Sequence, residues 1–298
     1  MVSPARLDLL DPAEVSRLGG IEIVAKGVVE GFLAGLHRSP FRGFSVEFTE
    51  HRAYQPGDEL RYLDWKILAR SDRLFVKQFE EETNLRAMIL VDASRSMAWR
   101  GGGAPGRLTK RAYADRLAAA LALILLRQRD ATGLITFDDA VRRVVPARVK
   151  AGQWTRFVRG LLDTPDGRGT AAQSALRHLT GLLARRGLVV LLSDLLFDRD
   201  LVLTALRYLR HRGHQVIVFH VMDPAEEELE QGGPPEVRFR DPESLASVVA
   251  RPRELARAYR ETVRREIAAW RTACRRHGIA YHHVRTDLPF GMALRLLA

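Results

Sequence analysis

The sequence predicts an α/β protein: a doubly wound, mostly parallel sheet preceded by a small β-rich N-terminal segment. Short apolar runs of strand length recur along the chain, at residues 88–91, 134–137, 188–192 and 215–221. Helix-length segments separate these runs, an alternation typical of a parallel sheet covered by helices on both faces. Before residue 85 the hydrophobic pattern is different: apolar and polar residues alternate, which indicates half-buried strands.

The N-terminal part is expected to hold helices at 12–18 and 21–36 and strands at 44–49 and 74–79. The apolar stripe of the second helix indicates that this helix docks on another element. The expected domains are therefore residues 1–84, a helix plus the β-rich segment, and residues 85–298, the α/β domain.

Further helices are expected in the α/β domain, at 109–129, 153–162, 171–184, 201–211, 252–277 and 289–297. Residues 141–145 predict an antiparallel edge strand and 279–284 a last strand. Residues 225–233 are acidic and end at prolines, which suggests an exposed loop, and 237–240 alternates as a short strand does.

The run at 88–91 ends in Asp92-Ala93-Ser94-Arg95-Ser96, where one carboxylate and two hydroxyls lie within five residues. Ligands of open parallel sheets bind beyond the carboxyl ends of strands. Hard divalent cations such as Mg²⁺ take oxygen ligands of this kind. The alternative is that Asp92, Ser94 and Ser96 only cap the following helix or close a turn.

Two further oxygen donors follow along the chain, Thr170 in a glycine-bearing loop and Asp194 at the end of the 188–192 strand. With them the chain resembles the von Willebrand factor A family and its metal-ion-dependent adhesion site, which uses D-x-S-x-S, a threonine and an aspartate in that order. The resemblance implies that Asp92, Ser94, Ser96, Thr170 and Asp194 hold one Mg²⁺ or Mn²⁺ ion. It also implies that the aspartates act largely through waters and that an acidic residue of a partner completes the site.

The segment from Tyr54-Gln55-Pro56-Gly57-Asp58 to Asp64-Trp65, followed by Ala69-Arg70 and Phe79-Glu80, resembles the signature of the bacterial family of domain of unknown function 58. Members carry a von Willebrand A-like domain directly after this segment. Relatives commonly occur beside a MoxR-type AAA+ ATPase, which implies that ATPase and a client protein as partners. Many relatives also carry a membrane hairpin before the signature, and we expect none here.

Four charged residues in or near this signature admit two interpretations: Arg52, Arg61, Asp64 and Arg70. Set among tyrosines and a tryptophan, they suit a semi-buried ion network that fixes the β-rich segment. They equally suit a surface that binds a partner.

The composition narrows the remaining classes of function. One cysteine, Cys274, excludes an internal disulfide framework and fits a reducing compartment. Neither a signal peptide nor a run long enough to cross a bilayer is visible, so we expect a cytoplasmic protein. The net charge of +11 is a property that nucleic-acid-binding proteins often have. No nucleic-acid-binding motif accompanies the charge, however.

The sequence thus predicts a non-catalytic, cation-dependent protein-binding adaptor that works with a MoxR-type ATPase on a client. The alternative is a metal-dependent phosphatase or other hydrolase that uses Asp92 as a phosphoryl acceptor. The usual second carboxylate two residues later is replaced by Ser94, which disfavours that chemistry. Nucleic-acid binding is the third class.

Overall fold

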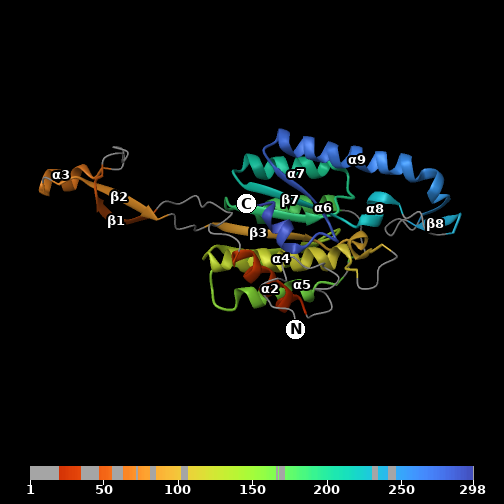
Figure 1. Cartoon of the computed structure of the whole chain (residues 1–298), viewed down its shortest axis with the longest axis horizontal. Helices are drawn as coiled ribbons and strands as arrows, with labels where there is room; N and C mark the ends of the chain where they lie inside the picture. Colours follow the sequence, from red (N-terminus) through yellow and green to blue (C-terminus); the bar gives the residue numbers. More distant parts are fainter. Residues whose placement is uncertain are drawn as a thin grey trace. The chain divides into compact units, whose positions relative to one another are not determined.

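The computed structural model describes residues 20–34, 47–55, 63–71, 73–80, 85–101, 107–165, 167, 172–229, 234–240 and 246–297. The short helix expected at 12–18 lies outside these residues. The chain divides into two compact units, one of residues 40–85 and the other of residues 1–39 and 86–298. Figure 1 shows the elements of both, and each unit is described by itself below.

The smaller unit pairs strand β1 (Glu47–Ala53) with β2 (Phe75–Glu80) in antiparallel fashion and carries helix α3 (Trp65–Ser71). Asp64 is buried, and its Oδ1 accepts a hydrogen bond from the Ile67 backbone N at 3.2 Å, so it caps the start of α3. Arg70 is exposed, and the side chains of Arg52 and Arg61 lie outside the described part of the chain. Asp64 therefore has a structural role in this unit.

The larger unit is built on a six-stranded sheet, counted over the described residues. Its strands are β3 (Arg86–Asp92), β4 (Ala131–Phe137), β5 (Val141–Arg148), β6 (Leu188–Ser193), β7 (Gln215–Met222) and β10 (Ala280–Arg285). Their order is β10-β7-β6-β3-β4-β5, and every neighbouring pair is parallel except β4 and β5. The predicted doubly wound, mostly parallel α/β sheet with an antiparallel edge is confirmed.

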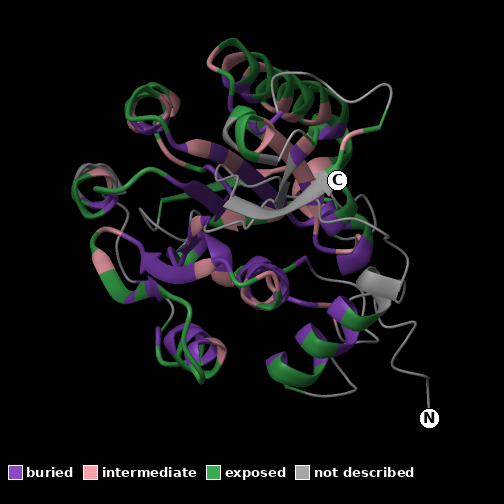
Figure 2. Cartoon of the chain, turned by 90° about the vertical axis from the view of Figure 1, so that its left-hand side faces the viewer, coloured by how far each residue is buried: buried purple, intermediate pink, exposed green. Residues whose placement is uncertain are grey.

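Helices cover both faces of this sheet (Figure 1). They are α2 (Ile21–Ala34), α4 (Lys110–Arg127), α5 (Gln153–Leu162), α6 (Ala172–Leu182), α7 (Arg199–His211), α9 (Pro252–Arg276) and α10 (Phe290–Arg295). Every residue of β6 is buried, and Figure 2 shows the central strands largely in the colour of buried residues. The continuous apolar run of β6 follows from this, because a strand covered on both faces has no polar side.

The long apolar helix α4 lies in the core, where most of its alanines and leucines are buried. It begins at Thr109, whose hydroxyl accepts a hydrogen bond from the Ala112 backbone N at 3.0 Å. No helix within the described residues combines the length and the apolar character needed to cross a membrane.

Helix α2 packs on α4 and α10 through a buried apolar stripe that includes Val24, Val28 and Val29. The sequence predicted the stripe and placed this helix in a domain of residues 1–84. In the structure the helix groups with the α/β unit instead, because the surface that buries its valines belongs to α4 and α10. The β-rich segment is thus a unit without this helix.

The sequence suggested an exposed loop at residues 225–233, but the first part of this segment is helical. Residues Pro224–Glu228 form a short helix, α8, whose start is closed by a capping box between Asp223 and Glu226. Farther along, β8 (Val237–Arg240) pairs with an unpredicted strand, β9 (Ser247–Ala250), in an antiparallel hairpin.

The order of the strands determines where a ligand would bind. From β3 the chain proceeds to β4 and β5 on one side, then returns to β6 on the other side of β3. Open α/β sheets bind ligands at such a reversal, in the crevice beyond the carboxyl ends of the strands. Asp92 ends β3 and Asp194 directly follows β6, so the fold brings the two predicted aspartates to this crevice.

Candidate metal centre

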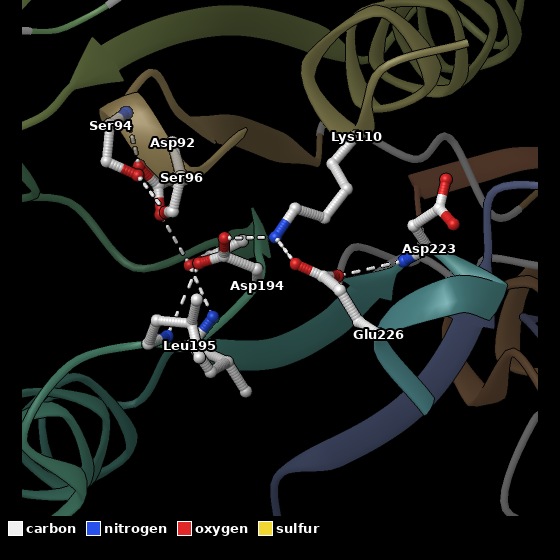
Figure 3. A network of polar contacts seen from close by, with 10 residues as sticks. Asp92, Ser94, Ser96, Lys110, Asp194, Leu195, Asp223 and Glu226 are labelled. Carbon is white, nitrogen blue, oxygen red and sulfur yellow. Dashed lines mark hydrogen bonds and ion pairs between the residues drawn. The ribbon is translucent and has the colours of Figure 1, made fainter. Parts of the chain in front are cut away.

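The turn that follows β3 holds three of the predicted site residues in direct contact. Asp92 is fully buried, and its Oδ1 accepts a hydrogen bond from the Ser94 backbone N at 2.8 Å. The hydroxyls of Ser94 and Ser96 lie 3.0 Å apart, and both side chains are buried (Figure 3). Ser96 belongs to the 3₁₀ helix η3 (Arg95–Ala98), which turns the two hydroxyls toward each other.

The end of β6 lies beside this turn because β3 and β6 are paired in parallel, with Val91 opposite Leu192. Ser193 donates a hydrogen bond from its hydroxyl to Oδ2 of Asp92 at 2.6 Å. Asp194 is buried next to it and accepts a hydrogen bond on Oδ1 from the Leu196 backbone N at 3.3 Å. Both oxygens of Asp92 are therefore occupied, and Ser193 joins the two strand ends.

The turn after Asp194 adopts a conformation that few side chains accept. Leu195 is buried and has a φ of 54°, in the left-handed region. Such a backbone costs about 1–3 kcal/mol for a residue other than glycine. The hydrogen bond from the Leu195 backbone N to the Ser193 hydroxyl, 2.9 Å long, is among the contacts that hold it.

Thr170 lies outside the described residues, but its loop has one described position, Gly167. The backbone N of Gly167 donates a hydrogen bond to the carbonyl oxygen of Ala93 at 2.6 Å. A Cβ atom at Gly167 would lie 2.5 Å from the Ala93 oxygen and 2.6 Å from Oδ2 of Asp138. Gly167, three residues before the threonine, is therefore in direct contact with the Asp92 turn.

A lysine that the sequence analysis did not single out lies on the other side of Asp194. Lys110, the first residue of α4, has no exposed surface. Its ammonium contacts Oδ2 of Asp194 at 2.7 Å and Oε1 of Glu226 at 2.5 Å (Figure 3). It also lies 6.0 Å from the centre of the Trp99 ring, within the range of a cation–π contact.

Glu226 is held firmly in this position by its own helix. Its second carboxylate oxygen, Oε2, accepts a hydrogen bond from the Asp223 backbone N at 3.0 Å, as part of the capping box of α8. The pattern Asp223-Pro224-Ala225-Glu226 is a recognisable helix start, and it was the signal that could have placed this glutamate. No comparable signal marks the burial of Lys110.

The two sides of Asp194 differ in their electrostatics. Burial, together with the neighbouring charge of Asp194, raises the pKa of Asp92 to about 7, although hydrogen bonds from Ser193 and Ser94 oppose the shift. Burial alone would lower the pKa of Lys110, but Asp194 and Glu226 outweigh it, so the lysine stays charged. Crowded carboxylates favour a bound cation, since its charge relieves their repulsion.

The oxygens present suit a small, hard cation. Mg²⁺ binds oxygens octahedrally at about 2.0–2.1 Å, so two adjacent ligands lie about 2.9 Å apart. The hydroxyls of Ser94 and Ser96 have nearly this separation, 3.0 Å. The described residues contain no cluster of three or more His, Cys, Asp or Glu side chains fit for a metal. The serine hydroxyls are the pair in this turn whose spacing fits adjacent ligands of one cation.

Two cavities flank the site, each of about 440 Å³. The first has Lys110, Asp194 and Glu226 at its polar end and apolar residues of α9 along its wall. The second extends from Ser96 to the β8–β9 hairpin and is lined largely by apolar side chains. Leu196, Glu226 and Tyr259 line both cavities, which therefore adjoin.

Comparison with known proteins gives relatives without a described activity. The chain is 30% identical over 246 residues to uncharacterized proteins of Mycobacterium bovis (strain AF2122/97) and Mycobacterium tuberculosis (strain H37Rv), over 81% of this chain and 75% of each relative. It is also similar in structure to the conserved hypothetical protein BatB from Bacteroides thetaiotaomicron. That match has a TM-score of 0.47 and 18% identity, and it covers 72% of this chain and 96% of BatB.

A family model matches most of the chain as well. Residues 50–272 match the family described as "Protein of unknown function DUF58". This span includes the signature segment, the Asp92 turn and Asp194. The chain belongs to the DUF58 family.

Proposed function

We propose that this protein is a non-catalytic adaptor that binds a partner protein through a divalent cation, Mg²⁺ or Mn²⁺. The observation that carries the proposal is the pair of buried hydroxyls of Ser94 and Ser96, 3.0 Å apart, at the crevice where the strand order reverses. Asp92 and Asp194 border this pair from two adjacent strand ends. A set of oxygens so poor in direct carboxylates leaves a bound cation electron-poor and open to a further ligand.

In this proposal each residue has one task. Ser94, Ser96 and Thr170 bind the cation, and Asp92 and Asp194 orient its waters. Asp92 already orients the turn through the Ser94 backbone N and the Ser193 hydroxyl. When bound, the cation supplies a positive charge that accepts a carboxylate of the partner.

The surroundings of the site favour a protein as the partner. Trp99, Leu196, Val248 and Leu255 are exposed apolar side chains, and all four line the cavity that begins at Ser96. Contiguous exposed apolar surface next to polar groups is typical of sites that bind other proteins. The family resemblance suggests a MoxR-type AAA+ ATPase and its client as the candidates.

The geometry disfavours Asp92 as a nucleophile. Its side chain has no exposed surface, and both of its oxygens accept hydrogen bonds. A phosphoryl acceptor needs one free oxygen in line with the leaving group. A hydrolase of this design would require the turn to open first.

The proposal is tested by binding of the purified MoxR-type ATPase of the same organism to the immobilised protein, in Mg²⁺ and in EDTA. We expect retention in Mg²⁺, loss in EDTA, and loss in Ser94→Ala. The matched control is Thr155→Ala, which removes an exposed hydroxyl from α5 and should bind normally.

Retention that persists in EDTA, or that Ser94→Ala leaves intact, contradicts the proposal. A parallel assay with p-nitrophenyl phosphate and Mg²⁺ addresses the hydrolase. Phosphate release that Asp92→Asn abolishes would assign the enzyme instead of the adaptor.

A further inference from the structure

The candidate metal centre contains a cation of its own, the ammonium of Lys110. It contacts Asp194, one of the predicted site residues, at 2.7 Å and is fully buried. Figure 3 shows the serine turn on one side of Asp194 and the lysine on the other. Any divalent ion that uses Asp194 must therefore share this carboxylate with an ammonium already in contact with it.

The position of this ammonium is fixed from three directions. Its helix begins at the Thr109 cap, Glu226 binds it at 2.5 Å, and the Trp99 ring lies 6.0 Å away. Glu226 is itself tied to the start of α8. The lysine cannot move away from Asp194 without leaving Glu226 and breaking this arrangement.

A purely structural role gives a weak account of the arrangement. Burying an ammonium with two carboxylates costs desolvation that their attraction barely offsets, and apolar residues of similar volume often stabilise a fold as well or better. A Lys, an Asp and a Glu drawn from three elements at the mouth of a crevice instead suit a role toward the ligand of that crevice.

We propose that Lys110 acts as a built-in competitor that weakens the affinity of the metal-free site for its cation, and that Glu226 limits this effect. The inference rests on the proposed function and concerns the same site. The ammonium competes with a metal ion for the carboxylate of Asp194, and its positive charge repels the metal ion. Glu226 offsets part of that charge. The affinity for the cation alone is therefore low, and a partner carboxylate, attracted by both cations, raises it.

Because of this coupling, the adaptor releases its ion when no partner is bound. If a carboxylate ligand raises the affinity for the cation, the cation raises the affinity for the carboxylate by the same factor. The cation and the partner then bind together, and the free protein stays largely metal-free.

The test is a titration of the full chain with Mn²⁺, in which electron paramagnetic resonance measures the concentration of free Mn²⁺ at each step. Lys110→Met matches the unbranched lysine side chain as far as Cε and removes the ammonium. We expect Mn²⁺ to bind this variant at least about tenfold more tightly than wild type, the scale of one nearby unit charge. Glu226→Gln leaves the ammonium with less compensation, so Mn²⁺ should bind it more weakly than wild type.

Lys150→Met is the matched control. It makes the same change of charge at an exposed lysine beyond β5, at the edge of the sheet opposite the site, and should bind Mn²⁺ as wild type does. Lys110→Met leaves the buried Asp194 and the partly buried Glu226 without their counter-ion. The double variant Lys110→Met/Glu226→Leu removes one of these two uncompensated carboxylates. It too should bind Mn²⁺ more tightly than wild type, because the ammonium contacts Asp194 directly.

The outcomes separate this inference from the proposed function. If wild type binds Mn²⁺ and folded Lys110 variants bind it no more tightly than Lys150→Met, the inference is wrong and the adaptor stands. If the Lys110 variants bind Mn²⁺ and free wild type does not, the inference holds, and the binding of the ATPase in Mg²⁺ and in EDTA decides whether the adaptor uses a cation. If no folded variant binds Mn²⁺, both are overturned.

Discussion

The two sides of Asp194 form one crevice with opposite properties. On the β3 side, Ser94 and Ser96 offer neutral hydroxyls, and burial holds the pKa of Asp92 near 7. On the α4 side, Lys110 places a full positive charge against Asp194 and Glu226. The hydroxyl side has the chemistry to accept a cation, whereas the lysine side opposes one. In the proposed site, the balance of the two sides, rather than the ligand pattern alone, would determine whether an ion binds.

The largest effect is expected on the hydroxyl side, from Asp92→Asn. The amide can keep the hydrogen bonds with Ser94 and Ser193, so the fold is retained while the charge that attracts the cation is lost. We expect the Mn²⁺ affinity to fall at least about a hundredfold, since a buried negative charge next to the bound cation is removed. The measurement is a Mn²⁺ titration, with Glu30→Gln on the exposed face of α2 as the control. Unchanged affinity in Asp92→Asn would remove Asp92 from the site.

The second effect is the dependence of the Mn²⁺ affinity on pH. Because a metal site uses the deprotonated carboxylate, and the pKa of Asp92 is about 7, the affinity should fall about tenfold per pH unit below 7. Titrations between pH 5 and 8 measure it. An affinity that stays flat over this range would show that Asp92 is ionised throughout.

The raised pKa of Asp92 also predicts that the metal-free protein becomes less stable as the pH rises. The folded chain holds the Asp92 proton up to about pH 7, whereas the unfolded chain releases it near 3.8. The stabilisation from this group is complete below pH 4 and is lost as the pH rises through 7, with a slope of about 1.4 kcal/mol per pH unit. Denaturant unfolding of wild type against Asp92→Asn isolates the slope, which the variant should lack.

A smaller effect is expected from the loop that carries Thr170. Gly167→Ala places a Cβ atom 2.5 Å from the carbonyl oxygen of Ala93 and must displace the loop from the Asp92 turn. We expect a loss of about 1–3 kcal/mol of stability from overpacking and a Mn²⁺ affinity lower by about tenfold. Gly181→Ala is the control, because a Cβ there meets nothing within 4 Å. Equal affinity in the two variants would show that the loop does not shape the metal centre.

The smallest effect is expected at the apolar cavity beside Ser96. Leu255 is 46% exposed and lines this cavity, so Leu255→Asp should leave stability within about 0.5 kcal/mol of wild type. Binding of the purified ATPase in Mg²⁺ should weaken about fivefold, from the loss of one apolar contact. Leu162→Asp, at an exposed leucine at the end of α5, serves as the control. If both variants bind alike, the partner does not use this cavity.

The hydroxyl side was accessible to sequence reasoning because it follows from the fold. Apolar runs predicted β3 and β6, and parallel strands end at one edge, so Asp92 and Asp194 were expected at the same edge. The family resemblance implied that they share a site, and the pairing of β3 with β6 places them side by side. The lysine side was not accessible. A lysine at the start of a helix usually faces water, and the burial of Lys110 depends on α8, which was expected to be an exposed loop.

Tertiary packing accounts for the other differences. The apolar stripe of α2 predicted a docked helix, but only the structure shows that α4 and α10 cover it. Strand β9 was missed because Ser247–Ala250 is short and mostly exposed, and so has no buried face to give an alternating pattern.

The central claim is that a divalent cation binds between the hydroxyls of Ser94 and Ser96. The most direct measurement is anomalous diffraction from crystals of the protein and of Lys110→Met soaked in Mn²⁺. We expect an anomalous difference peak for Mn²⁺ within bonding distance of both hydroxyls, with a higher Mn²⁺ occupancy in Lys110→Met. A peak elsewhere, or no peak in either protein, would contradict it.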